Sequence, residues 1–205
     1  MPSAIIEGNY PPRGDMQQRK EVVMARVNMP GLHTPAVGFD QPFEMLEACH
    51  ERMLRSLDLL QKLVRHVAQQ GGDTSAQQAA RDVVRYFDVA APLHHEDEER
   101  HIFPALLTPG SDARLQATVR HLQAEHVHMT ALWQRIRPPL QALAQGEPHQ
   151  PVFSAADAAQ MAEFVRIYEQ HLQQEEGLIY PAARQHTPAD ALPAMGQEMA
   201  ARRHV

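Results

Sequence analysis

Residues that are mostly apolar recur at alternating steps of three and four in four stretches of the chain. This spacing places side chains on one face of an α-helix. The first stretch carries Phe43, Leu46, His50, Met53, Leu57, Leu60, Val64 and Val67. The second carries Val84, Phe87, Ala91, His94, Glu98, His101 and Ala105. The third carries Leu115, Val119, Leu122, His126, Met129, Trp133, Ile136, Leu140 and Leu143, and the fourth carries Met161, Phe164, Tyr168, His171, Glu175, Leu178 and Ala182. The pattern predicts four amphipathic helices.

Segments rich in polar residues, glycine and proline separate these stretches. GGDTSAQQ follows the first stretch, TPGSDA follows the second, and a loop with Gly146, Pro148 and Pro151 follows the third. Ser154, with Asp157 three residues later, is typical of a helix N-cap. Four helices joined by short loops predict an all-α fold, an up-down-up-down antiparallel four-helix bundle over residues 42–186.

The regions on either side of the bundle differ from it in composition. Residues 1–41 hold prolines, glycines and few periodic apolar residues, so we expect an N-terminal arm with one short ordered piece around Arg19–Val27. Residues 187–205 are expected to form a C-terminal tail with a short helix around Met195–Arg203.

Three prolines fall inside the predicted helices. Pro92 lies in the second helix, and Pro138 and Pro139 lie in the third. Proline lacks the backbone N–H of the helical ladder, so each should kink its helix or end it early. The adjacent pair is expected to divide the third helix.

The composition narrows the function classes. The chain has 205 residues, enough for one domain with a sizeable core. Its net charge is −6 and it has no long basic block, which argues against a nucleic-acid partner. A single cysteine, Cys49, excludes an internal disulfide and any Cys-rich zinc or iron–sulfur site. No stretch has the pattern of a signal peptide or a membrane span, so we expect a cytoplasmic protein without a membrane partner.

One motif occurs twice. HHEDEERHIFPA at 94–105 matches HLQQEEGLIYPA at 171–182, at an offset of 77 residues. Each copy carries H-x-x-x-E, which is His94 with Glu98 in the first copy and His171 with Glu175 in the second. Four residues turn a helix by about 400°, so each histidine and its glutamate lie about 6 Å apart on one face.

Apart from His101, the apolar faces of the four helices therefore carry six histidines and glutamates. His50 and His126, 76 residues apart, add to the two motif pairs. At about 1.5 Å per residue, three of the histidines lie about 20 to 22 Å from one end of the bundle and His50 about 12 Å from it, which places them in one layer. Burying these groups unpaired would cost several kcal/mol each, so they need a common partner.

A metal site is the partner that fits four imidazoles and two carboxylates. One tetrahedral zinc ion does not need six ligands, whereas two ions do if the carboxylates bridge them and each ion takes two histidines. Nitrogen and oxygen donors without thiolate favour iron over manganese. Manganese and zinc stay as alternatives. Coordination positions would remain for water, an oxo bridge or a small diatomic molecule.

The two motif copies and the surrounding pattern, over about 43–185, resemble the bacterial hemerythrin-like, HHE-type cation-binding proteins. The resemblance implies a four-helix bundle around a non-haem di-iron centre with an oxo or hydroxo bridge. By the family's motif the implied ligands are His50, His94, Glu98, His126, His171 and Glu175, with the two glutamates as bridges.

The resemblance is closest to the four-histidine subgroup, which includes proteins implicated in repair of iron centres and in the response to nitric oxide or oxygen. Oxygen-carrying members have a fifth histidine one turn before the third-helix ligand, where this chain has Leu122. Their last carboxylate is an Asp five residues after histidine, whereas Glu175 follows His171 by four. Both departures argue against reversible oxygen carriage.

Simpler structural roles compete for individual residues. A surface salt bridge would explain His94 and Glu98 taken alone, and hydrogen-bonded core histidines would explain His50 and His126. His101, whose repeat partner is Leu178, is an extra ligand, a group that orients Glu98, or a partly solvated residue. The residues between the motif positions are expected to face solvent or to support the ligands; they are His95, Glu96, Asp97 and Glu99. Cys49 is expected to be a structural thiol, and Met53, Met129 and Trp133 are expected to pack in the core.

Four functions are consistent with such a site. The first is a sensor or binder of oxygen, nitric oxide or redox state. The second is an oxidase or peroxidase in which His101 or Tyr168 assists proton transfer. The third is donation or repair of iron centres, and the fourth is a metal-free scaffold. The arm, with Val22, Val23 and Val27, makes a homodimer a further expectation.

Overall fold

The computed structural model describes residues 38–146 and 152–203. In this part of the chain every regular element is helical, and strands are absent, which confirms the predicted all-α class. Residues 1–37 of the predicted arm, including Val22, Val23 and Val27, lie outside the described residues, as does the loop at 147–151.

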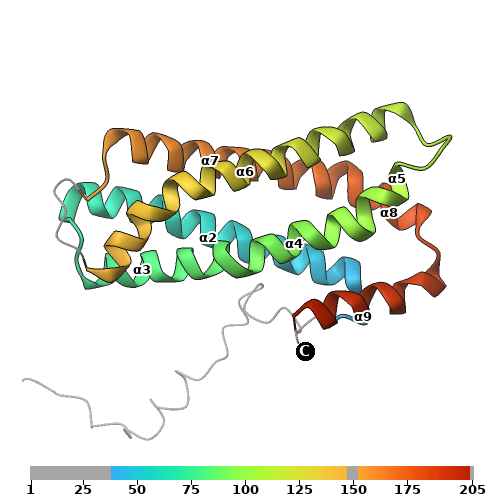
Figure 1. Cartoon of the computed structure of the whole chain (residues 1–205), viewed down its shortest axis with the longest axis horizontal. Helices are drawn as coiled ribbons and strands as arrows, with labels where there is room; N and C mark the ends of the chain where they lie inside the picture. Colours follow the sequence, from blue (N-terminus) through green and yellow to red (C-terminus); the bar gives the residue numbers. More distant parts are fainter. Residues whose placement is uncertain (1–37, 147–151, 204–205) are drawn as a thin grey trace, which may run out of the picture. The chain divides into compact units, whose positions relative to one another are not determined.

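Four long helical segments lie side by side (Figure 1). The first is α2 (Pro42–Gln70) and the third is α6 (Ala113–Gln145). The second consists of α3 (Thr74–Arg85), η2 (Tyr86–Ala90), α4 (Ala91–Asp97), η3 (Glu98–Ile102) and α5 (Phe103–Leu106). The fourth consists of α7 (Ala155–Gln174), η4 (Glu175–Ile179) and α8 (Tyr180–His186). A short 3-10 turn, η5 (Ala189–Ala191), leads into α9 (Leu192–Arg202), where the tail was expected to hold a helix.

Side-chain caps fix the starts of three helices. Asp73 accepts a hydrogen bond from the Ala76 N–H at 2.8 Å, and Asp112 accepts one from the Arg114 N–H at 2.7 Å. Ser154 and Asp157 form the reciprocal capping box that the sequence predicted. Such caps satisfy N–H groups that the first turn of a helix leaves unpaired.

Three π turns interrupt the helical segments, and a proline follows each of them. The turns are η2, η3 and η4, closed by hydrogen bonds from the N–H of Ala91, Phe103 and Tyr180 to the carbonyl five residues earlier. The next residue is Pro92, Pro104 or Pro181. A π turn leaves a carbonyl without its usual partner, so a residue lacking an N–H is tolerated there. The prediction for Pro92 was therefore right that the α-helix ends before it, at Arg85, but the helical segment continues.

The prediction that Pro138 and Pro139 divide the third helix was wrong. α6 runs through both prolines to Gln145. Arg137 donates hydrogen bonds of 2.7 and 2.9 Å to Asp88 on the neighbouring segment, and Ile136 and Leu140 are fully buried on either side. Tertiary contacts thus outweigh the two missing backbone hydrogen bonds.

The π turns also shift which residues face inward. The regular pattern predicted His101 and Ala105 after Glu98, but Ile102, Phe103 and Leu106 are buried instead. Likewise Ile179, Tyr180 and Ala183 are buried after Glu175, where Leu178 and Ala182 were predicted. A π turn contains more residues than an α turn, so the inward face moves by about one residue beyond it.

The core has two apolar clusters. The six predicted histidine and glutamate ligands lie between them, and we call these residues the polar layer. One cluster contains Met53, Leu57, Phe87, Met129, Phe164 and Tyr168 among others. The other contains Leu46, Phe103, Leu122, Tyr180, Met195 and Met199 among others. Along each of the four segments, the predicted histidines fall between a residue of one cluster and a residue of the other.

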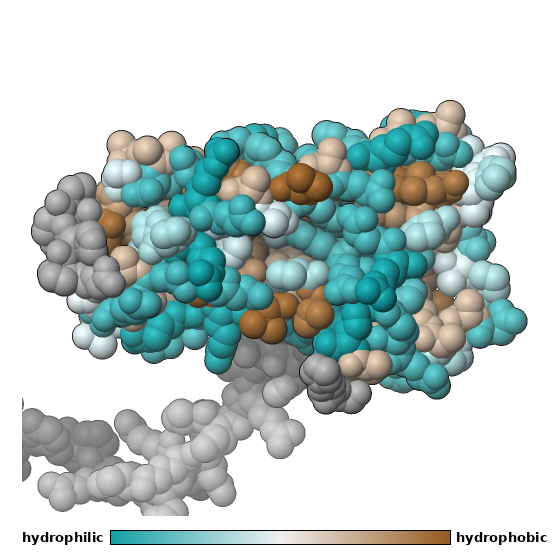
Figure 2. Space-filling view, in the orientation of Figure 1, coloured by the Kyte–Doolittle hydropathy of each residue, from teal (hydrophilic) through white to brown (hydrophobic). Residues whose placement is uncertain are grey.

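The outer surface is mostly hydrophilic in the face drawn in Figure 2, with small separate hydrophobic patches. The large hydrophobic residues exposed in the described ranges are Leu54, Val89 and Val127. None of the helices at 38–146 and 152–203 is both long and apolar enough to cross a membrane.

Candidate metal centre

All six residues that the sequence singled out lie in the polar layer. His50, Glu98 and Glu175 have no exposed surface, and His94 and His171 are 1% exposed. His126 is 5% exposed. The structure therefore brings together every predicted ligand in the interior.

The four histidines form two pairs. The Nε2 atoms of His50 and His94 lie 2.9 Å apart, and we call this pair half-site one. The Nε2 atoms of His126 and His171 lie 3.0 Å apart, and we call this pair half-site two. Each pair comes from two consecutive helical segments.

Each glutamate points one oxygen toward each half-site. For Glu98, Oε1 lies 3.4 Å from His94 Nε2 and Oε2 lies 3.5 Å from His126 Nε2. For Glu175, Oε2 lies 3.4 Å from His50 Nε2 and Oε1 lies 2.9 Å from His171 Nε2. Both carboxylates thus span the gap between the half-sites.

The unpaired carboxylate oxygens show that the layer fits cations. Within the described ranges, Glu98 Oε2 and both oxygens of Glu175 are buried and accept no hydrogen bond. Buried carboxylates normally have a hydrogen-bond or metal partner, because an unpaired one is strongly destabilising. One donor atom from each of His50, His94, Glu98 and Glu175 lies within 4.8 Å of the others, and the same holds for Glu98, His126, His171 and Glu175. These residues can hold two cations that share both carboxylates.

Protons provide the balancing charge when no cation is bound. Burial lowers the pKa of His50, but the nearby carboxylates of Glu175 and Glu98 outweigh this effect and raise the pKa to about 9. Burial opposes charge on His171 too, and the charge of Glu175 raises its pKa to about 9. Burial favours the neutral form of Glu98, yet the charge of His94 holds the pKa of this carboxyl well below its usual range.

Outer carboxylates orient three of the four imidazoles. The Nδ1 atom of His50 lies 3.0 Å from Glu176 Oε1, and that of His126 lies 3.0 Å from Glu99 Oε1. The Nδ1 atom of His171 lies 2.9 Å from Glu125 Oε2. An Nδ1–H that donates to a carboxylate leaves the Nε2 lone pair free for a metal, which is the usual arrangement of metal-bound histidine.

His94 has a different neighbour. In the described part of the chain its Nδ1 atom forms no hydrogen bond of normal geometry. The thiol of Cys49 interacts with His94 instead: burial raises the pKa of the thiol, but His94 outweighs this effect and lowers it. Cys49 is half-buried, with Met45 Sδ 3.5 Å away.

Two aromatic rings cover the half-sites. Tyr180 stacks on His50 at a ring-centroid distance of 5.1 Å, and Phe103 stacks on His126 at 5.5 Å. The Tyr180 hydroxyl lies 3.0 Å from His50 Nε2 and donates a 2.6 Å hydrogen bond to Glu98 Oε1. Burial raises the pKa of Tyr180 well above its usual value, so this hydroxyl keeps its proton.

His95 also borders half-site two. Its ring stacks on His126 with centroids 4.0 Å apart and planes 9° apart, and it lies 6.2 Å from the His171 ring. Burial lowers the pKa of His95 well below its usual value, so the imidazole is neutral. Its Nε2 atom is buried and has no hydrogen-bond partner in the described ranges.

His101 and Asp97 both contact residues of α9. His101 Nε2 pairs with Glu198 of α9 and belongs to neither group of candidate ligands, so it is no ligand in this arrangement. Asp97 was expected to face solvent or to support the ligands; it is fully buried, and Arg202 and Arg203 donate hydrogen bonds to its carboxylate. α9 thereby attaches to the residue next to Glu98.

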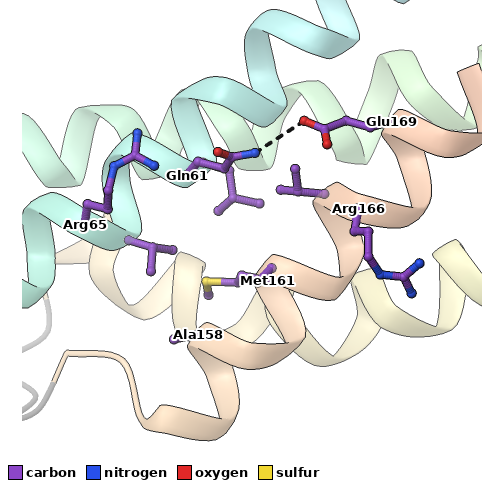
Figure 3. Close-up of a pocket in the computed structure, with 10 residues that line it drawn as sticks. Gln61, Arg65, Ala158, Met161, Arg166 and Glu169 are labelled. Carbon is purple, nitrogen blue, oxygen red and sulfur yellow. Dashed lines mark hydrogen bonds between the residues drawn. The ribbon is translucent and has the colours of Figure 1, made fainter. Parts of the chain in front are cut away.

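A separate pocket lies between α2 and α7 (Figure 3). It has a volume of about 340 Å³, and its lining includes Leu60, Arg65, Met161, Arg166 and Glu169. Leu60 is ten residues from His50 and Met161 is ten from His171, which is about 15 Å along each helix. This pocket therefore does not open onto the polar layer at those residues.

The periodic pattern of apolar positions identified the candidate ligands but not the residues around them. Glu125, Glu176, Tyr180, Arg202 and Arg203 were not assigned to the site. Part of the signal was present, because Glu99 and Glu176 occupy equivalent positions of the repeat. Arg202 and Arg203 carry no comparable pattern.

Comparisons with known proteins agree with this geometry. The family model described as the hemerythrin HHE cation binding domain matches residues 41–183. An uncharacterized protein of Haemophilus influenzae is 30% identical over 167 residues, which cover 82% of this chain and 92% of that protein. The matched range contains all six candidate ligands and the four long helical segments except the last three residues of α8. The chain belongs to the hemerythrin HHE cation-binding family.

Proposed function

We propose that this chain is a hemerythrin-like protein that holds a non-haem di-iron centre and uses it to bind oxygen or nitric oxide or to sense redox state. In this proposal the helices form an up-down-up-down four-helix bundle around the centre, with α9 attached outside it. The supporting observation is that two buried glutamates each direct one oxygen to each histidine pair, and that three of the four oxygens have no hydrogen-bond partner among the described residues.

The donor set supports iron as the metal. Four imidazole nitrogens and four carboxylate oxygens, without a thiolate among them, suit iron better than a soft metal ion. Two ions that each bind two histidines, and that share both carboxylates, would keep free coordination positions. Bound iron would supply a change of redox state and a position for a small ligand.

The protein's own residues would prepare the site. Glu99, Glu125 and Glu176 accept the Nδ1 protons and so fix which nitrogen of His126, His171 and His50 faces the centre. Tyr180 holds a proton against Glu98. The two apolar clusters on either side exclude bulk water from the layer.

Metal analysis combined with absorption spectroscopy tests the proposal. Protein purified after iron supplementation should contain two iron ions per chain, and its spectrum should change on exposure to oxygen, nitric oxide or reductant. If the protein instead contains stoichiometric amounts of manganese or zinc, that metal takes the place of iron in the proposed centre. If the protein binds no metal even with excess iron, the result would contradict the proposal and favour the metal-free scaffold.

The same sample separates the alternatives that the resemblance implies. Transfer of iron to a metal-free acceptor protein would favour donation or repair of iron centres. Turnover of peroxide with a reductant would favour an oxidase or peroxidase. Reversible spectral change without transfer or turnover supports the proposed binder or sensor.

A further inference from the structure

The two half-sites are related by the internal repeat. His50 corresponds to His126, His94 to His171, and Glu98 to Glu175. The equivalence extends to contacts, because Glu176 pairs with His50 Nδ1 as Glu99 pairs with His126 Nδ1, both at 3.0 Å. Positions that break this equivalence therefore show how the half-sites differ.

The covering ring is the first difference. Tyr180 and Phe103 occupy equivalent repeat positions and stack on equivalent histidines, at 5.1 and 5.5 Å. Only Tyr180 has a hydroxyl, and it lies between His50 Nε2 and Glu98 Oε1. Half-site one is thus closed by an oxygen atom that half-site two lacks.

The second difference is the residue after the motif histidine. His95 follows His94 and borders half-site two, whereas the equivalent position in the other copy is Leu172. The buried Nε2 atom of His95 has no hydrogen-bond partner in residues 38–146 and 152–203. A buried polar nitrogen of this kind needs a partner that these residues do not supply.

The third difference is access from solvent. A pocket of about 330 Å³ is lined by His95, Glu99 and His126, together with Val127 and Thr130 on the outer turns of α6. His126 is 5% exposed, whereas its counterpart His50 is fully buried. Half-site two therefore borders this pocket through the side chains of His95 and His126.

We propose that the centre is asymmetric, so that a small exogenous ligand binds on the side of half-site two and accepts a hydrogen bond from His95, while Tyr180 keeps half-site one closed. This inference rests on the proposed di-iron function and specifies where its ligand binds. His95 is a positioning residue in this scheme, and its imidazole donates from the buried Nε2 atom, which has no other partner in the described ranges.

Azide binding to the oxidised, iron-loaded protein tests the inference. Azide is a small anion whose binding to ferric iron produces new absorption bands, so its Kd and the iron content can be measured on one sample. The decisive variant is Phe103→Tyr, which places in half-site two the hydroxyl that Tyr180 places in half-site one. His95→Leu copies the other repeat, and His95→Asn keeps an N–H donor. His101→Leu, a histidine that contacts α9 outside the centre, is the matched control.

The expected results differ between these variants. Phe103→Tyr should weaken azide binding at least about tenfold with two iron ions still bound, because the hydroxyl occupies the ligand's position. His95→Leu should weaken it about three- to tenfold, the range for one lost hydrogen bond, and His95→Asn should recover part of the loss. His101→Leu should match the unaltered protein.

Failures of the inference and of the proposed function can be told apart. An unaltered chain without two iron ions contradicts the proposed function itself. Only the inference is overturned if the unaltered protein binds two iron ions but forms no azide adduct. The same holds if azide affinity is unchanged in both Phe103→Tyr and His95→Leu.

Discussion

Arg203, the residue after α9, donates a hydrogen bond of 2.6 Å to the buried carboxylate of Asp97. Asp97 directly precedes Glu98, and Arg202 donates to the same carboxylate. The C-terminal helix is therefore joined by charge to the segment that carries a bridging glutamate. Apolar contacts of Met195 and Met199 with the second cluster add to this attachment.

Replacing both arginines should destabilise the metal-free protein. The variant Arg202→Ala/Arg203→Ala leaves Asp97 as a buried charge without its partners, which typically costs about 3 to 5 kcal/mol. Denaturant unfolding would measure the loss. Arg100→Ala is the control, because this exposed arginine pairs with Glu96 and Glu198 and should contribute under about 1 kcal/mol. Equal stabilities of the two variants would rule out the attachment as a stabilising element.

Gly196 in α9 is predicted to tolerate no side chain. A Cβ atom there would lie 1.7 Å from the carbonyl oxygen of Phe39, so Gly196→Ala should push α9 away and cost about 1 to 3 kcal/mol. Gly177→Ala is the matched control, since its Cβ would meet nothing within 4 Å and alanine favours helix. Thermal unfolding should show a lower Tm for the first variant and an equal or higher Tm for the second; a reversed order would contradict the packing of α9.

Loss of an outer carboxylate should weaken metal binding without removing a metal-facing atom. Glu125→Gln replaces the acceptor 2.9 Å from His171 Nδ1, and Glu99→Gln replaces the one 3.0 Å from His126 Nδ1. Changes of this kind typically lower metal affinity about 10- to 100-fold. Competition with a chelator would measure it, with the exposed Glu169→Gln as control. Affinities indistinguishable from that control would show that these carboxylates do not orient the imidazoles.

The metal-free protein should lose stability as the pH rises from about 6.5 to 9. His50 and His171 have pKa values of about 9 in the folded protein, above the ordinary value of 6.5. The folded state therefore binds more protons than the unfolded state within this window, and the stabilisation is complete below pH 6.5 and lost through pH 9. Each histidine accounts for up to about 3 kcal/mol.

Chelator-treated protein would be unfolded with denaturant at several pH values to measure this slope. The double variant His50→Gln/His171→Gln should show a flatter dependence, because neither position can then take up a proton. A free energy of unfolding that stays constant or rises over the window in the unaltered protein would contradict the charge balance described for the layer.

Constant helical periodicity explains what the sequence could predict. It places His50, His94, His126 and His171 correctly, because no π turn lies between each histidine and the apolar residues nearest to it on the same face. Beyond Glu98 and Glu175 the same periodicity fails, since each of these residues begins a π turn. His101 was accordingly placed inward, where Ile102 is buried.

Other features depend on contacts between distant segments. The pairing of Asp97 with Arg203 joins residues 106 positions apart, and no local pattern indicates it. The third helix persists through Pro138 and Pro139 because of contacts with Asp88 and the core, which lie outside any local propensity.

The repeat gives the chain the architecture of a symmetric dimer fused into one polypeptide. In a two-fold interface residue i of one copy contacts j of the other, and j contacts i in return. Glu176 of the second copy reaches His50 of the first, and Glu99 of the first reaches His126 of the second. Two identical chains must keep both sides of such an interface the same, whereas a fused pair can change one side at a time. Cys49 opposite Glu125, and Tyr180 opposite Phe103, are the kind of divergence that this freedom allows around an otherwise matched set of six residues.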